Sequence, residues 1–125
     1  MSEEQRKKKV LIVEDNDLNL KLFNDLLVAH NFATVETRNG REVIELAELE
    51  KPDLIIMDIQ LPNISGIDVI KDIKSRNNLA HIPVIAVTAF AMVDDEKRIL
   101  DAGCESYLAK PISIDTFVAT VKKYI

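Results

Sequence analysis

The sequence LIIMDIQLP, residues 54–62, joins an unbroken apolar run to an aspartate and ends on a proline. Four consecutive apolar residues bounded by turn-forming residues are typical of a strand buried on both faces of a parallel sheet. Asp58 follows that run directly, at the point where burial should end. A second stretch, VLIVED at residues 10–15, has the same form and carries Glu14 and Asp15. Both stretches therefore predict strands with acids at their carboxyl ends.

The bulk composition limits the class of protein. A chain of 125 residues that is 47% apolar and 30% charged is expected to fold as one globular domain. The net charge of -5 argues against a nucleic-acid-binding surface. No segment approaches the roughly 20 apolar residues of a membrane helix. Cys104 is the only cysteine, which favours a reducing compartment, so we expect a cytoplasmic protein that does not insert into membranes.

Apolar runs alternate with helical spacing along the chain. Strands are predicted at residues 10–13, 34–37, 54–57, 84–87 and 106–109. Stripes of helical spacing follow them at residues 18–27, 43–47, 67–73, 93–102 and 114–125, of which 93–102 is the least apolar. Such strand–helix units predict an α/β fold: a flavodoxin-like, doubly wound, five-stranded parallel sheet of order 2-1-3-4-5 with five helices. Residues 1–8 should form a flexible leader and residues 9–125 the single domain.

Polar residues follow four of the predicted strands and should meet at one edge of the sheet. They are Glu14 and Asp15 after the first strand, Asp58 after the third, Thr88 after the fourth and Lys110 after the fifth. Each alone has an ordinary explanation, because acids and threonines after strands often cap the next helix. Their convergence on one edge indicates a site.

Three carboxylates at this edge would need protons or a cation. Two charges about 4 Å apart repel by roughly 4 kcal/mol at an effective dielectric constant of about 20. The two histidines lie elsewhere in the sequence and the cysteine is single, so the ligands of a zinc site are missing. An all-oxygen set favours Mg²⁺, which often binds together with a phosphate. Thr88 and Lys110 could hold phosphoryl oxygens, and Asp58 is then the available nucleophile, giving an acyl phosphate.

This set of residues, in this order and spacing, resembles the receiver domain of two-component response regulators. The loop DIQLPNISG, with Pro62 and Gly66 after Asp58, matches the loop that follows the phosphoacceptor in that family. The likeness covers residues 9–125. Finer stretches, VEDNDLN, VTAFAM and GCESYLAKPIS, are similar to single-domain members that act in cell division.

The resemblance implies a role for each matching position. Asp58 would accept a phosphoryl group from a histidine kinase or a histidine phosphotransfer protein, with Thr88 and Lys110 contacting the phosphate. Mg²⁺ would be bound directly by Asp15, Asp58 and the main-chain carbonyl of Gln60, and by Glu14 mainly through water. Tyr107 matches the switch aromatic that turns inward as Thr88 moves.

Further expectations concern the loops and the output. The resemblance implies that the Lys110–Pro111 peptide is cis and that Gln60 and Phe90 set water access to the acyl phosphate, where a bulky Phe90 would slow autodephosphorylation. With Ile125 one helix after Lys110, we expect no attached output domain. A downstream protein would then read residues 93–102, strand 106–109 and the last helix, while the kinase docks near residues 18–23.

Three alternatives compete with this interpretation. An aspartate-nucleophile phosphohydrolase of the haloacid dehalogenase kind would also use Mg²⁺, but it needs a second aspartate as general acid where this chain has Gln60. A flavodoxin would need a Ser/Thr-rich loop where Glu14 and Asp15 would repel the flavin phosphate. The chain could also be a receiver cut from a hybrid kinase.

Overall fold

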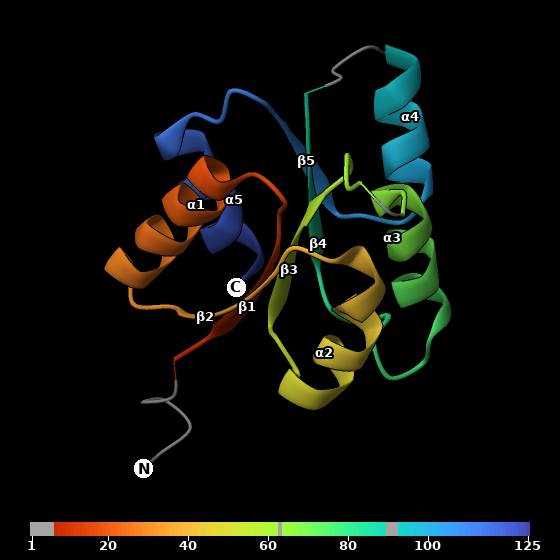
Figure 1. The fold of residues 1–125 in the computed structure, drawn as a ribbon, viewed down its shortest axis with the longest axis horizontal. Helices are drawn as coiled ribbons and strands as arrows, with labels where there is room; N and C mark the ends of the chain where they lie inside the picture. The colour runs from red at the N-terminus through yellow and green to blue at the C-terminus, as the bar shows by residue number, and fades with distance from the viewer. Residues whose placement is uncertain (1–6, 63, 90–92) are drawn as a thin grey trace.

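The computed structural model describes residues 7–62, 64–89 and 93–125, and these form alternating strands and helices (Figure 1). The strands are β1 (Lys9–Val13), β2 (Ala33–Thr37), β3 (Leu54–Asp58), β4 (Val84–Thr88) and β5 (Ser106–Ala109). The helices are α1 (Asp17–Ala29), α2 (Val43–Glu50), α3 (Gly66–Ser75), α4 (Val93–Asp101) and α5 (Ile114–Tyr124), with a short 3-10 turn, η2 (Gly40–Glu42), before α2. No helix in these ranges has the length and apolar character needed to cross a membrane.

The described strands form one parallel sheet in the order β2-β1-β3-β4-β5. This confirms the predicted doubly wound topology. The strands β3 and β4 run one residue further than predicted, so Asp58 and Thr88 are the last residues of their strands. The hydrogen-bond ladder between β3 and β4 continues past the apolar runs. Ile59 N, one residue beyond β3, donates to Val87 O at 3.0 Å.

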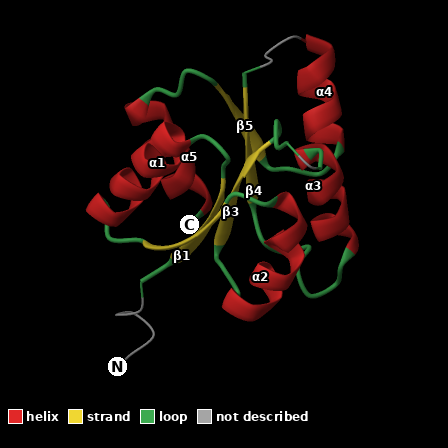
Figure 2. Ribbon diagram, viewed as in Figure 1, coloured by secondary structure: helices red, strands yellow, loops and turns green. Residues whose placement is uncertain are grey.

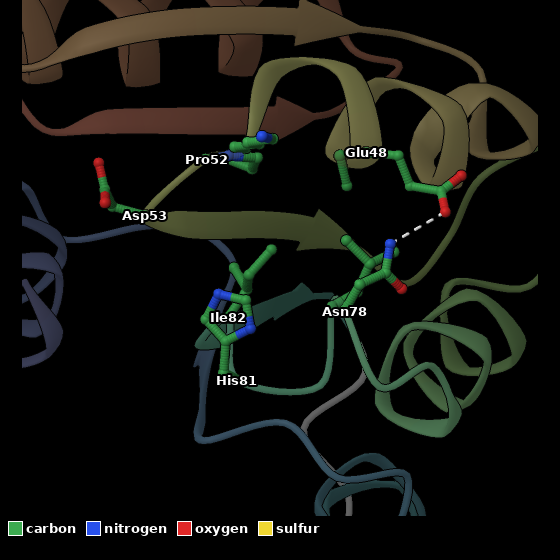
Figure 3. Close-up of a pocket in the computed structure, with 9 residues that line it drawn as sticks. Glu48, Pro52, Asp53, Asn78, His81 and Ile82 are labelled. Atoms are coloured by element: carbon green, nitrogen blue, oxygen red, sulfur yellow. Dashed lines mark hydrogen bonds between the residues drawn. The ribbon is translucent and has the colours of Figure 1, made fainter.

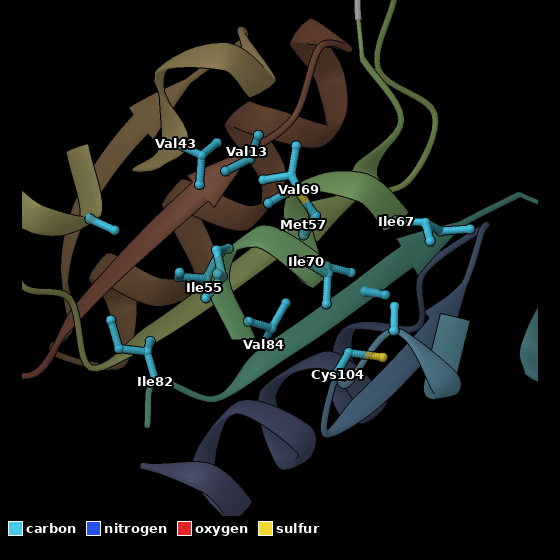
Figure 4. Packing of buried hydrophobic residues seen from close by; sticks show 14 of the residues in the cluster. Val13, Val43, Ile55, Met57, Ile67, Val69, Ile70, Ile82, Val84 and Cys104 are labelled. Atoms are coloured by element: carbon cyan, nitrogen blue, oxygen red, sulfur yellow. The ribbon is translucent and has the colours of Figure 1, made fainter. Parts of the chain in front are cut away.

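Helices cover both faces of the sheet (Figure 2). Because side chains alternate along a strand, Val10 and Ile12 of β1 face α1 and α5, while Leu11 and Val13 face the opposite helices. On the first face Phe23 and Phe117 stack with ring centroids 4.8 Å apart. On the second face the central strands pack against the apolar side chains of α2, α3 and α4 (Figure 4). The apolar content of the central strands therefore reflects burial on both sides.

Short polar residues cap the starts of α1 and α3, and residues with positive φ follow the ends of α1 and α4. Asn16 Oδ1 accepts from Asn19 N at 3.0 Å before α1, and Ser65 Oγ accepts from Ile67 N at 3.2 Å before α3. Asn31 has φ 71° after α1, and Gly103 has φ 110° after α4. Asn and Gly are the residues that most often adopt this conformation after a helix, so both helix ends agree with the sequence.

A partly buried ion pair ties the amino ends of β4 and β5 to α3. Lys74 Nζ donates to Glu105 Oε1 at 2.6 Å and to the carbonyl oxygens of Ala80 and Ile82 at 3.2 and 2.8 Å. The other Glu105 oxygen accepts from Val84 N at 2.6 Å. One lysine therefore holds the α3–β4 connection and the residue before β5 together.

We predict that Lys74→Met lowers the free energy of unfolding by about 2–3 kcal/mol, because a charged acceptor and two carbonyls lose their donor together. Urea unfolding measures the loss. The matched control is Lys71→Met, since Lys71 is an exposed lysine on the same helix. Equal stability of the two variants would show that the Lys74 contacts contribute nothing net.

Candidate functional site

Four strands bring polar side chains to one edge of the sheet. Glu14 follows β1, Asp58 ends β3, Thr88 ends β4, and Lys110 follows β5. Three of these residues are almost fully buried, with 0% of Glu14, 3% of Asp58 and 1% of Thr88 exposed. Lys110 Nζ lies 3.3 Å from Glu14 Oε1 and 3.4 Å from Asp58 Oδ2. One ammonium group therefore lies against two buried carboxyl groups.

The loop after β3 orients the Asp58 carboxylate. Gln60 N donates to Asp58 Oδ1 at 2.9 Å, so the loop backbone fixes the rotation of the side chain. Gly66 N donates to Ile59 O at 3.1 Å, which brings the start of α3 against the end of β3. A Cβ atom at Gly66 would lie 2.5 Å from Asp58 O, so this approach requires glycine. The loop pattern after Asp58 is thus a geometric requirement of the site.

The buried side chain of Glu14 is only partly hydrogen-bonded. Its Oε2 accepts from Asn16 N at 3.2 Å, while Oε1 is buried without a hydrogen-bond partner in the described part of the chain. Lys110 is close enough to Oε1 for an ion pair but lacks the geometry of a hydrogen bond. Burial, followed by the adjacent Asp58 carboxyl, raises the pKa of Glu14 to about 7. The edge therefore holds more acidic groups than Lys110 can balance.

The position of the Asp15 side chain differs from the prediction that three carboxylates cluster at this edge. The side chain is exposed, and the carbonyl oxygen of Asp15 accepts from Arg38 Nη1 at 3.2 Å. Arg38 also forms an ion pair with Asp17 at the start of α1. Across residues 7–62, 64–89 and 93–125, no group of three or more His, Cys, Asp or Glu side chains is arranged to hold a metal ion. Asp15 lies two residues beyond β1, on the loop leading to α1, and this explains its separation from the buried pair Glu14 and Asp58.

The side chain of Gln60 makes a contact that the sequence pattern did not indicate. Gln60 Oε1 accepts from Ala89 N at 3.0 Å and so joins the β3–α3 loop to the residue after β4. The sequence analysis considered Gln60 for its main-chain carbonyl, for water access to the acyl phosphate and as a missing general acid, but not for a bond to the residue after β4. No local signal identifies the second contact, because it depends on how two loops distant in sequence approach each other.

Tyr107 and the Lys110–Pro111 peptide are the remaining predicted features within the described ranges, and Tyr124, which was not predicted, makes a contact before the amino end of β5. Tyr107 of β5 is half-buried, and a hydrogen bond with the Glu96 carboxylate of α4 raises the pKa of its hydroxyl. Tyr124 of α5 donates its hydroxyl to Glu105 O at 3.1 Å. The Lys110–Pro111 peptide is cis, as expected. Phe90 falls outside the described residues.

A separate cavity of about 210 Å³ lies at the opposite edge of the sheet, beside the amino ends of β3 and β4 (Figure 3). Its polar groups serve the fold. Asn78 Nδ2 donates to Glu48 Oε2 at 3.1 Å, and Asp53 Oδ2 accepts from Lys9 N at 2.8 Å. Cys104 is also part of the core, where burial raises the pKa of its thiol to about 11. Within the described ranges, the buried carboxyl groups that lie beside an ammonium group are at the edge that carries Asp58.

Comparison with known proteins assigns the family. The sequence profile of the response regulator receiver domain matches residues 10–122. The chain belongs to this family. It is 57% identical over 118 residues to the polar-differentiation response regulator DivK of Brucella anthropi, covering 94% of this chain and 96% of that protein. The DivK protein of Brucella ovis is 56% identical over the same length and with the same coverage.

Solved structures agree with the fold. A putative response regulator from Chloroflexus aurantiacus superposes with a TM-score of 0.91 at 25% identity, covering 95% of this chain and 98% of that chain. The receiver domain of the sensor histidine kinase PA1611 from Pseudomonas aeruginosa has a TM-score of 0.87 at 28% identity, with the same coverage. That second structure holds a magnesium ion in its active site cleft. The predicted family and its flavodoxin-like fold are both confirmed.

We predict that Lys110→Met lowers the free energy of unfolding by roughly 3 kcal/mol in the presence of EDTA, because it leaves two buried carboxyl groups without their cation. Chemical denaturation at mildly alkaline pH measures the change. Lys122→Met on α5 is the control, since Lys122 is exposed. A Lys110 variant as stable as this control would mean that the ammonium does not offset the carboxylate charge.

Proposed function

We propose that this chain is a response regulator in which Asp58 accepts a phosphoryl group from a phosphohistidine. The receiver is assigned to residues 9–125. One observation carries the proposal: the Asp58 carboxylate is buried at the carboxyl end of β3, with Gln60 N donating to Oδ1 at 2.9 Å and Lys110 Nζ 3.4 Å from Oδ2. A carboxylate held by an ammonium group and a backbone N–H is oriented for attack on phosphorus.

The reaction exchanges one bond to phosphorus for another. A carboxylate oxygen of Asp58 attacks the phosphorus of the donor phosphohistidine, and the new P–O bond forms as the P–N bond breaks. The electron pair of the broken bond stays on the donor imidazole, which takes up a proton. Lys110 balances the negative charge of the transferred group, and the Thr88 hydroxyl at the end of β4 donates to one of its oxygens. Water later hydrolyses the acyl phosphate and restores Asp58, so the chain is a phosphoacceptor rather than a turnover enzyme.

The donors at this edge suit Mg²⁺ in kind, and the Asp15 side chain would turn from solvent toward Asp58 to bind the same ion. The donors are oxygen atoms, and the buried Glu14 Oε1 lacks a hydrogen-bond partner within the described structure. We assign the direct ligands as the carboxylates of Asp15 and Asp58 and the carbonyl of Gln60, with Glu14 acting through water. The exposed Asp15 remains accessible to a hydrated ion. When bound, Mg²⁺ neutralises charge on the phosphoryl oxygens. The magnesium ion in the Pseudomonas aeruginosa receiver supports this assignment.

The partners follow from the same chemistry. A histidine kinase or histidine phosphotransfer protein supplies the phosphoryl group, a kinase acting as phosphatase can remove it, and a downstream protein reads the phosphorylated surface. That surface consists of α4, β5 and α5, with Thr88 and Tyr107 as the switch residues. The 57% identity to a polar-differentiation regulator supports a role in cell-cycle or cell-division control in the cytoplasm. Neither nucleic acid nor membrane is needed for this output.

The phosphoacceptor assignment is tested by Asp58→Asn. With Mg²⁺ and acetyl phosphate, the wild type should gain one acid-stable, base-labile phosphoryl group, and the variant should gain none because an amide oxygen is a poor nucleophile. Intact-protein mass spectrometry measures the added group. Asp53→Asn at the other end of β3 is the control and should be phosphorylated normally. Labelling of Asp58→Asn at the wild-type level, or repeated turnover of a small phosphomonoester, would contradict the proposal.

The switch assignment is tested by Tyr107→Ala. In the wild type, the phosphoryl mimic beryllofluoride should shift the amide NMR signals of α4 and β5 as well as those around Asp58. In the variant, the signals around Asp58 should still shift while the effect on α4 is reduced. Tyr124→Phe is the control, because it removes a hydroxyl that bonds at the other end of β5. An unchanged response of α4 in Tyr107→Ala would exclude Tyr107 as the link.

A further inference from the structure

Gln60 makes two hydrogen bonds at the edge of the sheet that carries Asp58, one through its backbone and one through its side chain. Its backbone N–H donates to Asp58 Oδ1 at 2.9 Å, and its side-chain Oε1 accepts from Ala89 N at 3.0 Å. The Ala89 N–H therefore lies within the reach of one side chain from the Asp58 carboxylate. We call the hydrogen bond between Gln60 Oε1 and Ala89 N the Gln60 bridge.

The Ala89 N–H is a donor for which a phosphoryl group on Asp58 can compete. A phosphoryl group adds three strong acceptor oxygens and negative charge to the carboxylate. A charged acceptor makes a hydrogen bond roughly twice as strong as a neutral one, so it should take this N–H from the neutral amide of Gln60. Ala89 directly follows Thr88, which ends β4 at this edge, so the donor lies next to the residue assigned to the phosphate.

Space is present for the side chain once it is released. Gln60 and Thr88 line a cavity of about 170 Å³ that extends toward Ile99 of α4. The amide group is only half-buried, so water can hydrate it when the Gln60 bridge opens. Opening therefore costs one partly exposed hydrogen bond, without a large rearrangement of the core.

We propose that the Gln60 bridge is an autoinhibitory contact: it occupies the Ala89 N–H, holds the residue after β4 to the β3–α3 loop, and is displaced when Asp58 carries a phosphoryl group. Gln60 thus acts through its side chain as a positioning residue, separately from its main-chain carbonyl. This inference rests on the proposed phosphorylation of Asp58. Phosphorylation of Asp58 must then break the Gln60 bridge, and the free-energy cost of breaking it depends on the amide oxygen of Gln60.

The test compares the wild type with Q60M and Q60E. Methionine keeps the length of the side chain but removes the acceptor, whereas glutamate keeps an acceptor and gives it charge. The first readout is hydrogen exchange of the Ala89 amide by NMR without phosphodonor, which should be faster in Q60M than in wild type. The second readout is the affinity for beryllofluoride at saturating Mg²⁺. It should rise by about 2- to 5-fold in Q60M, since one partly exposed hydrogen bond no longer opposes binding, and fall in Q60E.

The two readouts separate this inference from the function on which it rests. Wild-type protein that binds no beryllofluoride overturns the proposed function, and the competition falls with it. A wild type that binds beryllofluoride normally, with no gain in affinity for Q60M, overturns the autoinhibitory contact alone. Unchanged exchange of the Ala89 amide in Q60M would show that the Gln60 bridge does not protect that N–H, which also overturns the proposal.

Discussion

The Lys110 ammonium group between two buried carboxyl groups is the interaction on which the site depends. Glu14 and Asp58 come from neighbouring strands and are both removed from water, an arrangement that is costly unless a cation lies close to them. Lys110 follows β5 and reaches past the end of β4 to Asp58 on β3, and past the ends of β4 and β3 to Glu14 after β1. The sheet order is therefore a condition for the site, because it brings three distant segments to one place. Lys110 supplies one positive charge for two carboxyl groups, so a second cation can also bind here. The two cations together would then attract an incoming anion.

The two edges of the sheet are built differently. At the amino ends of β4 and β5, Lys74 and Glu105 form direct bonds to the backbone and to each other. At the carboxyl ends, Lys110 lies against Glu14 and Asp58, and the Gln60 bridge joins the β3–α3 loop to the residue after β4. The contacts at the amino ends hold the strands together, whereas those at the carboxyl ends hold the groups assigned to phosphoryl transfer.

Much of this site could be predicted because parallel strands carry their ends to a common edge. Apolar runs that stop at Asp58 and before Glu14 locate two strand ends without any knowledge of the structure, and the favoured strand order 2-1-3-4-5 makes those strands neighbours. Side chains on irregular backbone were less predictable. Asp15 is adjacent to Glu14 in sequence, yet the loop turns its side chain to solvent. The contacts of Gln60 with Ala89 and of Lys74 with Glu105 join residues far apart in sequence, and no periodicity signals them.

The position of the two tyrosines gives this chain a built-in optical reporter. The sequence has two tyrosines and no tryptophan, so the near-ultraviolet emission of the protein comes from Tyr107 and Tyr124. Tyr107 bonds to a carboxylate of α4, and Tyr124 bonds to the backbone just before β5. Both fluorophores therefore belong to the α4–β5–α5 surface, and neither belongs to the opposite half of the molecule. Changes in emission intensity would follow that surface in unlabelled protein, with no dye and no engineered residue.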